Sequence, residues 1–185
     1  SYQQITLLVI SLFFCFYLLG FDNLHFSNQT WLLNGDLSQY QLGWKFYRED
    51  IWRFPLGLNP NYGITNSSSI VFSDSIPLFA IIFKVLRNFL PENFQYFSLW
   101  IFICIYLQGL LSFKIIYNLT KNTSYSLVSC LFFIFSTILI NRSGIHLSLT
   151  AHWLILGYFY VQISALNYKD FKKHLIIYLS LLIHF

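Results

Sequence analysis

The stretch FSLWIFICIYLQGLLSFKIIY, residues 97–117, decides the class of the fold. It contains 21 residues and a single charged side chain, Lys114. A helix needs about 20 predominantly apolar residues to cross the hydrocarbon core of a bilayer, which is about 30 Å thick. We therefore predict that residues 97–117 form a membrane-spanning helix.

The composition of the whole chain agrees with this interpretation. Of its 185 residues, 56% are hydrophobic and only 10% are charged, whereas about 25% of the residues in a typical soluble domain are charged. Further apolar runs at residues 5–21, 125–140 and 149–166 predict three more spans, and another run begins at residue 175. We expect residues 1–185 to form the N-terminal part of one transmembrane domain in an all-α polytopic membrane protein.

The charged residues predict how the chain is oriented. Segment 22–96, between the first two predicted spans, holds six of the seven acidic residues and five of the eleven basic ones. Short loops rich in Lys and Arg stay on the cytoplasmic side, and here they follow the second and fourth predicted spans. Segment 22–96 is then an extracytoplasmic loop, provided that residues 75–90 do not cross the bilayer. Runs of this length are typical of interfacial or re-entrant segments, but a crossing would move the acidic loop to the cytoplasm.

Several classes of function find no support in the sequence. The basic residues that give the net charge of +4 lie largely where membrane topology would put them, so nucleic acid is not an expected partner. Cys15, Cys104 and Cys130 lie in apolar runs without metal or redox spacing. The chain also contains no Walker, dinucleotide-binding, zinc-protease or serine-hydrolase motif.

Two helices are expected within the loop at segment 22–96. Asp36 and Gln39 have the N-cap and N3 spacing of a capping box. Apolar side chains then recur at steps of three and four, namely at Leu37, Tyr40, Trp44, Tyr47 and Ile51. Such a stripe beside a charged face predicts a helix over residues 37–51 that lies in the lipid headgroup layer. A second helix is predicted over residues 75–90, with Pro77 in its first turn.

Asp36 and Asp74 are the candidate catalytic residues. A carboxylate held at the membrane surface against an apolar wall has a raised pKa, which suits a general base. The alternative role is structural, because each acid precedes an expected helix and could cap its free N–H groups.

Six other residues are candidates for binding a substrate. Lys45, Arg48 and Arg53 could hold a phosphate or pyrophosphate, or their side chains could simply snorkel from a surface helix. Beside the turn that joins the third and fourth predicted spans stand Arg142, His146 and His152. These three could bind an anionic leaving group or relay a proton, although His152 could instead satisfy a backbone carbonyl between helices.

The order of these features resembles the GT-C superfamily of membrane glycosyltransferases, and more closely a bacterial multi-span family placed near GT-C. A first span is followed by a long external loop with an early acid, then by an acid–Pro segment and more spans. The similarity covers nearly the whole chain. It is carried by the strings Gly35-Asp36, Trp52-Arg53-Phe54-Pro55-Leu56-Gly57, Ser73-Asp74-Ser75-Ile76-Pro77-Leu78, Leu107-Gln108-Gly109 and His146-Leu147-Ser148-Leu149-Thr150-Ala151-His152-Trp153.

This resemblance implies a GT-C-like helical bundle in the bacterial inner membrane. It implies transfer of a sugar from a polyprenyl-phosphate-linked donor to a cell-envelope acceptor on the extracytoplasmic face. By position, Asp36 matches the first-loop acid that acts as general base, and Asp74 resembles the acid of the acid–Pro segment. Arg142 and His146 would line the donor side by proximity. Many relatives have Asp-x-Asp or Asp-Glu where this chain has Gly35-Asp36, so a divalent cation is left open as a cofactor.

Two other functions are alternatives. A transporter or flippase of lipid-linked saccharides would carry ionisable residues buried within its spans, and the spans predicted here carry almost none away from their ends. A non-catalytic membrane subunit would leave the acidic loop without a task. The first hypothesis is therefore inverting sugar transfer, with a membrane lipid as the donor; the sequence specifies neither the sugar, the acceptor nor the oligomeric state.

Overall fold

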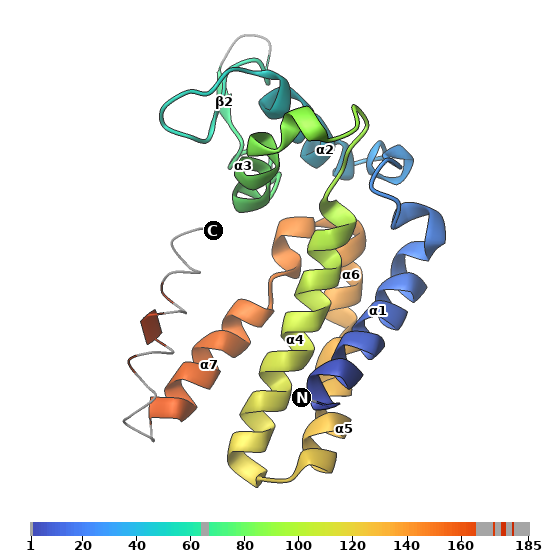
Figure 1. Ribbon diagram of the computed structural model, residues 1–185, viewed down its shortest axis with the longest axis vertical. Coiled ribbons are helices and arrows are strands. Elements are labelled where there is room, and N and C mark those ends of the chain that lie inside the picture. Colours follow the sequence, from blue (N-terminus) through green and yellow to red (C-terminus); the bar gives the residue numbers. More distant parts are fainter. Residues whose placement is uncertain (1, 64–66, 166–171, 173–174, 177–178, 180–185) are drawn as a thin grey trace.

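The computed structural model describes residues 2–63, 67–165, 172, 175–176 and 179. Within these ranges the chain is mostly helical (Figure 1). The apolar run predicted from residue 175 lies almost wholly outside the described residues.

Among the described residues, two helices are each long and apolar enough to cross a membrane. They are α1 (Tyr2–Asn23) and α4 (Phe97–Thr120), which contain 22 and 24 residues. At 1.5 Å per residue α4 extends about 36 Å, and the part of α1 before the non-helical residue Gly20 extends about 27 Å; the hydrocarbon core is about 30 Å thick. They pack against each other (Figure 1) and include the runs 5–21 and 97–117 on which the membrane assignment rested.

The helix predicted over residues 125–140 is not continuous. The chain forms α5 (Thr123–Ile134) and α6 (Thr137–Ile145), which are bent by 42° at the break between them and would together make one broken span or a re-entrant loop. The break lies at Phe135 and Ser136, where Ser136 leaves the helical region with ψ 127°. The sequence gives little sign of this break, because neither Gly nor Pro marks it and only Ser136 and Thr137 interrupt the apolar run there.

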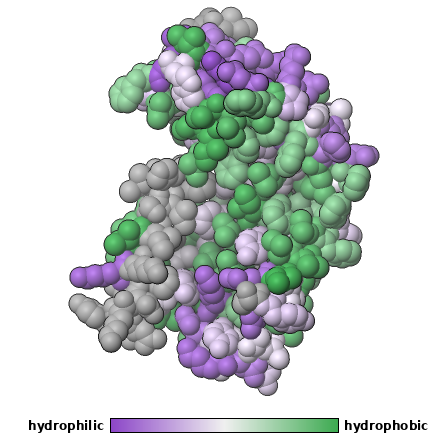
Figure 2. Space-filling model, in the orientation of Figure 1, coloured by the Kyte–Doolittle hydropathy of each residue, from purple (hydrophilic) through white to green (hydrophobic). Residues whose placement is uncertain are grey.

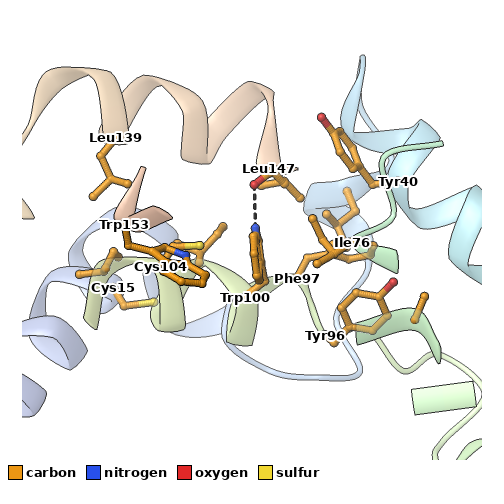
Figure 3. Close-up of a cluster of buried hydrophobic side chains, with 14 of the residues drawn as sticks. Cys15, Tyr40, Ile76, Tyr96, Phe97, Trp100, Cys104, Leu139, Leu147 and Trp153 are labelled. Atoms are coloured by element: carbon orange, nitrogen blue, oxygen red, sulfur yellow. Dashed lines mark hydrogen bonds between the residues drawn. The ribbon is translucent and has the colours of Figure 1, made fainter. Parts of the chain in front are cut away.

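The helix predicted over residues 149–166 begins later than expected. Residues Leu147–Thr150 form a 3-10 turn, η3, and the helix α7 runs over Trp153–Ala165. The turn is held against α4 because the indole N–H of Trp100 donates to the carbonyl of Leu147 at 2.7 Å (Figure 3). This tertiary hydrogen bond explains the later start of α7, since it holds the backbone of η3 outside the helix.

The segment between α1 and α4 folds into a cap at one end of the helices (Figure 1). Its elements are η1 (Thr30–Leu32), α2 (Leu37–Glu49), the paired strands β1 (Leu58–Asn59) and β2 (Ser68–Ser69), α3 (Pro77–Val85) and η2 (Arg87–Phe89). The helix predicted over residues 75–90 is thus shorter, being α3 followed by η2. Its nine residues extend about 14 Å, too little to cross a bilayer, and the turn after α6 lies at the same end as the cap (Figure 1).

Part of the apolar stripe of α2 packs against protein. Tyr40, Trp44 and Tyr47 are buried, and the rings of Trp44 and Tyr96 lie 5.1 Å apart in an edge-to-face contact. The Trp44 indole N–H donates to the Phe94 carbonyl at 3.0 Å. An aromatic segment ahead of α4 thus covers these three residues, whereas Ile51 lies beyond the end of α2 and is exposed. The location of α2 in the headgroup layer stays a prediction.

The surface has the pattern of a membrane protein. Figure 2 shows hydrophilic residues gathered at the two ends and hydrophobic residues across the band between them. Many large apolar side chains of α1 are exposed there, including Phe13, Tyr17 and Phe21. A soluble protein rarely leaves so large an apolar surface uncovered, whereas lipid tails would cover it.

Candidate functional site

A cavity of about 190 Å³ lies where the segment before α3 meets the start of α4 and the turn around η3. Asp74, Trp100 and Ser148 are among its lining residues, and each comes from a different part of this junction. Apolar side chains complete the walls, including those of Ile76 and Leu154. Trp100 and Ile76 lie close to η3 in Figure 3. The cavity thus joins one acid of the cap to the end of a membrane-spanning helix.

Buried serines on either side fix the backbone at Asp74. Ser75 Oγ donates to the Tyr40 carbonyl at 2.8 Å and lies 2.8 Å from Ser73 Oγ. Asp74 itself has φ 52° and Ile76 has φ 51°, a left-handed conformation that is uncommon for residues other than Gly. Such strained backbone clusters at functional sites. The expectation that Asp74 caps the next helix is wrong, because α3 has Ile76 at its N-cap and no side-chain cap bond in the described structure.

Charges and hydroxyl groups meet at this cavity. Burial raises the pKa of Asp74, and the nearby His146 lowers it in part. Burial also raises the pKa of Tyr40; a hydrogen bond with Ser148 lowers it, and the charges of Asp74 and Asp36 raise it. Tyr40 therefore connects both candidate acids to the turn that contains Ser148.

Asp36 lies at the start of α2, one turn before Tyr40, and its side chain is exposed. The predicted capping box does not form: the Asp36 side chain makes no cap bond within the described residues. Its backbone is already helical, with φ −66° and ψ −24°, whereas a capping residue has extended dihedrals. The other half of the box is engaged elsewhere, since Gln39 Nε2 donates to the Phe72 carbonyl at 3.1 Å.

The turn after α6 brings Arg142, His146 and His152 to the same end as Asp74. Arg142 is in the last turn of α6 and His146 ends that helix. His152 precedes α7; burial lowers its pKa, and the charge of Arg142 lowers it further. Its backbone N–H donates to the Thr150 carbonyl at 2.8 Å. These predicted binding residues thus lie at the same end of the molecule as the cavity. His146 acts on the pKa of Asp74, and Arg142 acts on that of His152.

The other three predicted binding residues do not join them. The Arg48 guanidinium donates to four carbonyls, those of Arg87, Leu90, Pro91 and Glu92. Arg53 forms an ion pair with Asp50 at 2.7 Å, and this hydrogen bond holds the pKa of Asp50 below its usual range. Lys45 lines a different cavity. The phosphate-binding trio expected from the sequence is therefore not assembled.

Lys84, which the sequence did not mark as a candidate, has a side chain that is only 1% exposed. Its Nζ donates to the Ile51 carbonyl at 3.1 Å and lies 3.9 Å from the centre of the Tyr47 ring. Burial lowers the pKa of this amine to about 8. The sequence did contain a sign that Lys84 is buried, because it follows Ile76 and Ala80 at steps of four and so shares the apolar face that leads into α3. Among the described residues, no group of three or more His, Cys, Asp or Glu side chains could hold a metal ion.

One comparison with known proteins gives a match. The model of a family described as "Domain of unknown function (DUF6311)" matches residues 8–185. The chain belongs to the DUF6311 family. No curated protein and no solved structure matches it. The DUF6311 match includes both the cap and the turn after α6, so every candidate residue from Asp36 to His152 lies inside the family domain.

Proposed function

We propose that this DUF6311 protein is a membrane glycosyltransferase. It moves a sugar from a polyprenyl-phosphate-linked donor to a cell-envelope acceptor on the extracytoplasmic face of the inner membrane. The observation that carries the proposal is that Asp74 and Ser148 line one cavity beside the helix α4, with Tyr40 hydrogen-bonded to Ser148. The resemblance of the sequence to GT-C enzymes supplies the reaction class.

The chemistry assigns a proton transfer to Asp74. The acceptor hydroxyl gives its proton to the Asp74 carboxylate while its oxygen forms a bond to C1 of the donor sugar. The bond between C1 and the lipid phosphate breaks, and the phosphate leaves with the bonding electrons, so the configuration at C1 is inverted. A raised pKa suits this step, because a base is most effective when its pKa approaches the working pH.

The leaving phosphate needs positive charge nearby. Arg142 and His146 are at the end of α6, and His146 is near enough to lower the pKa of Asp74. Arginine binds phosphate through paired hydrogen bonds. We therefore assign these two residues to the leaving group, and we prefer Asp74 to Asp36 as the base because Asp74 lines the cavity; partial desolvation there also raises its pKa.

The test is sugar transfer by the full-length protein carrying Asp74→Asn, with a polyprenyl-phosphate sugar as donor and extracted envelope material as acceptor. Removal of a general base lowers the rate by about 10²–10⁴-fold. Asp22→Asn is the matched control, since Asp22 is an exposed acid outside the cavity, and its rate should equal that of the wild type.

Two outcomes would contradict this assignment. Full activity of Asp74→Asn, with loss of activity in Asp36→Asn, would move the base to Asp36. Translocation of the intact lipid-linked saccharide in proteoliposomes, without any transfer of sugar, would replace the transferase with a flippase.

A further inference from the structure

A second cavity, of about 290 Å³, lies on another side of α2. It is lined by Gln41, Trp44, Lys45 and Glu49 of α2, together with Gln29 and Glu92 from flanking segments. It shares none of these residues with the Asp74 cavity. Its size is close to the lower end of the range for small-molecule sites, about 300–1,000 Å³. It belongs to the cap, so a ligand would reach it from the aqueous side.

Gln41 gives the first reason to expect a ligand. Its side chain is 2% exposed, and its Oε1 has no hydrogen-bond partner among the described residues. A buried acceptor without a donor costs about 1–3 kcal/mol, so native proteins rarely retain one without a reason. A ligand hydroxyl in this cavity would supply the missing donor.

The charges of the lining do not favour a phosphate. The positive charges of Lys45 and Arg48 are offset by the carboxylates of Glu49 and Glu92, and the donors of the Arg48 guanidinium are already bonded to four carbonyls. An anion therefore finds no net positive charge in this cavity, whereas the hydroxyl groups of a neutral ligand can donate to carboxylates and amides and accept from the Lys45 ammonium group.

The remaining wall is apolar. The indole N–H of Trp44 is bonded to the Phe94 carbonyl at 3.0 Å, so its ring presents carbon atoms to the cavity beside Leu90 and Phe94. One apolar wall facing amides and carboxylates matches a molecule that has C–H groups on one face and hydroxyl groups around its edge.

We infer that this cavity between α2 and the segment ahead of α4 binds a neutral saccharide through Gln41, with Lys45, Glu49 and Glu92 holding its hydroxyl groups. The inference goes beyond the proposed function, because it requires binding and no turnover. The saccharide would dock to the cap whether or not Asp74 acts as a base.

The test is saturation-transfer NMR on the full-length protein in a detergent without a sugar headgroup. Maltose, cellobiose and diacetylchitobiose serve as probes. At least one should receive saturation from the wild-type protein, and Gln41→Leu should weaken its binding by about tenfold, or about 1.4 kcal/mol. Gln108→Leu is the matched control, because Gln108 is also a buried glutamine with an unpartnered Oε1 in the described chain, but lies in α4.

The outcomes separate the two proposals. Asp74→Asn should bind the probe like the wild type, so a failure of the transferase hypothesis leaves this result unaffected. The melting temperature of Gln41→Leu should be no lower than that of the wild type, because the substitution removes an unsatisfied polar group. If Gln41→Leu does not fold, Gln29→Ala at the rim of the cavity is tested in its place, and it should weaken binding of the saccharide. The inference is overturned if none of the three disaccharides binds, if Gln41→Leu binds normally, or if inorganic pyrophosphate displaces the sugar.

Discussion

At the residue scale, close packing around Gly43 positions the candidate site. A Cβ at this position would overlap the Ser73 side chain and stand 2.5 Å from Ser75 Oγ. Overpacking of this kind costs about 1–3 kcal/mol, so Gly43→Ala should lower the free energy of unfolding by that amount. The same serines hold Asp74, and activity should fall as well. Gly144→Ala is the control for thermal unfolding, since nothing lies within 4 Å of the position that its methyl group would take; equal losses in both variants would contradict this reasoning.

Lys84 predicts a dependence of stability on pH. Burial lowers the pKa of its amine from 10.5 to about 8, so between these values the unfolded chain binds more protons than the folded one. Stability from this group therefore rises as pH increases across that window. In thermal melting from pH 7 to 10.5, the melting temperature of the wild type should rise relative to that of Lys84→Met above pH 8. A constant difference between the two proteins would mean that the amine is not desolvated.

Single residues also show what the sequence could and could not reveal. Asp74 is recognisable as a candidate because an acid followed by a Pro-started helix is a visible pattern. Its advantage over Asp36 is not visible, because that depends on a cavity that Asp74 shares with Ser148, a residue 74 positions later in the chain. The surroundings of Arg48 are hidden for a similar reason: its charge is evident in the sequence, but the carbonyls that accept from its guanidinium lie about 40 positions later in the chain.

At the scale of elements, Arg48 fastens α2 to the loop between η2 and α4. Its guanidinium donates to four backbone carbonyls of residues 87–92. Lysine carries the same charge but lacks the planar fork of donors. Arg48→Lys should therefore lower the free energy of unfolding by about 1–2 kcal/mol, the value of one charged hydrogen bond partly exposed to water. Lys45→Gln on the same helix should change the melting temperature little; a similar loss there would indicate a general charge effect.

The long helices were easier to predict than their breaks. The runs that became α1 and α4 correspond to about 26 Å and 32 Å of helix, close to the thickness of the hydrocarbon core, so length and composition identify them. The bend between α5 and α6 has no Gly or Pro to announce it, and the turn at η3 depends on a hydrogen bond from Trp100. Such features follow from tertiary contacts and not from local pattern.

At the scale of the whole molecule, the arrangement of the candidate site depends on topology. The cap and the turn after α6 lie at one end, and the loop between α4 and α5 lies at the other (Figure 1). The distribution of Lys and Arg in the short loops led to the same expectation. What the sequence did not reveal is that the buried residues of the cap continue the hydrophobic core of the helices, because three stripe residues of α2 are covered by residues from beyond α3.

Cysteine labelling in whole cells tests this topology directly. Cys15, Cys104 and Cys130 are all buried, so the background with a membrane-impermeant maleimide should be low. Ser67 and Asn141 are exposed at the cap end, and Lys121 is exposed at the opposite end. Ser67→Cys and Asn141→Cys should react in intact spheroplasts, whereas Lys121→Cys should react only after permeabilisation. Protection of Asn141→Cys in intact spheroplasts would place the turn with Arg142 and His146 across the bilayer from the cap, and the shared cavity at Asp74 could not then exist in the membrane.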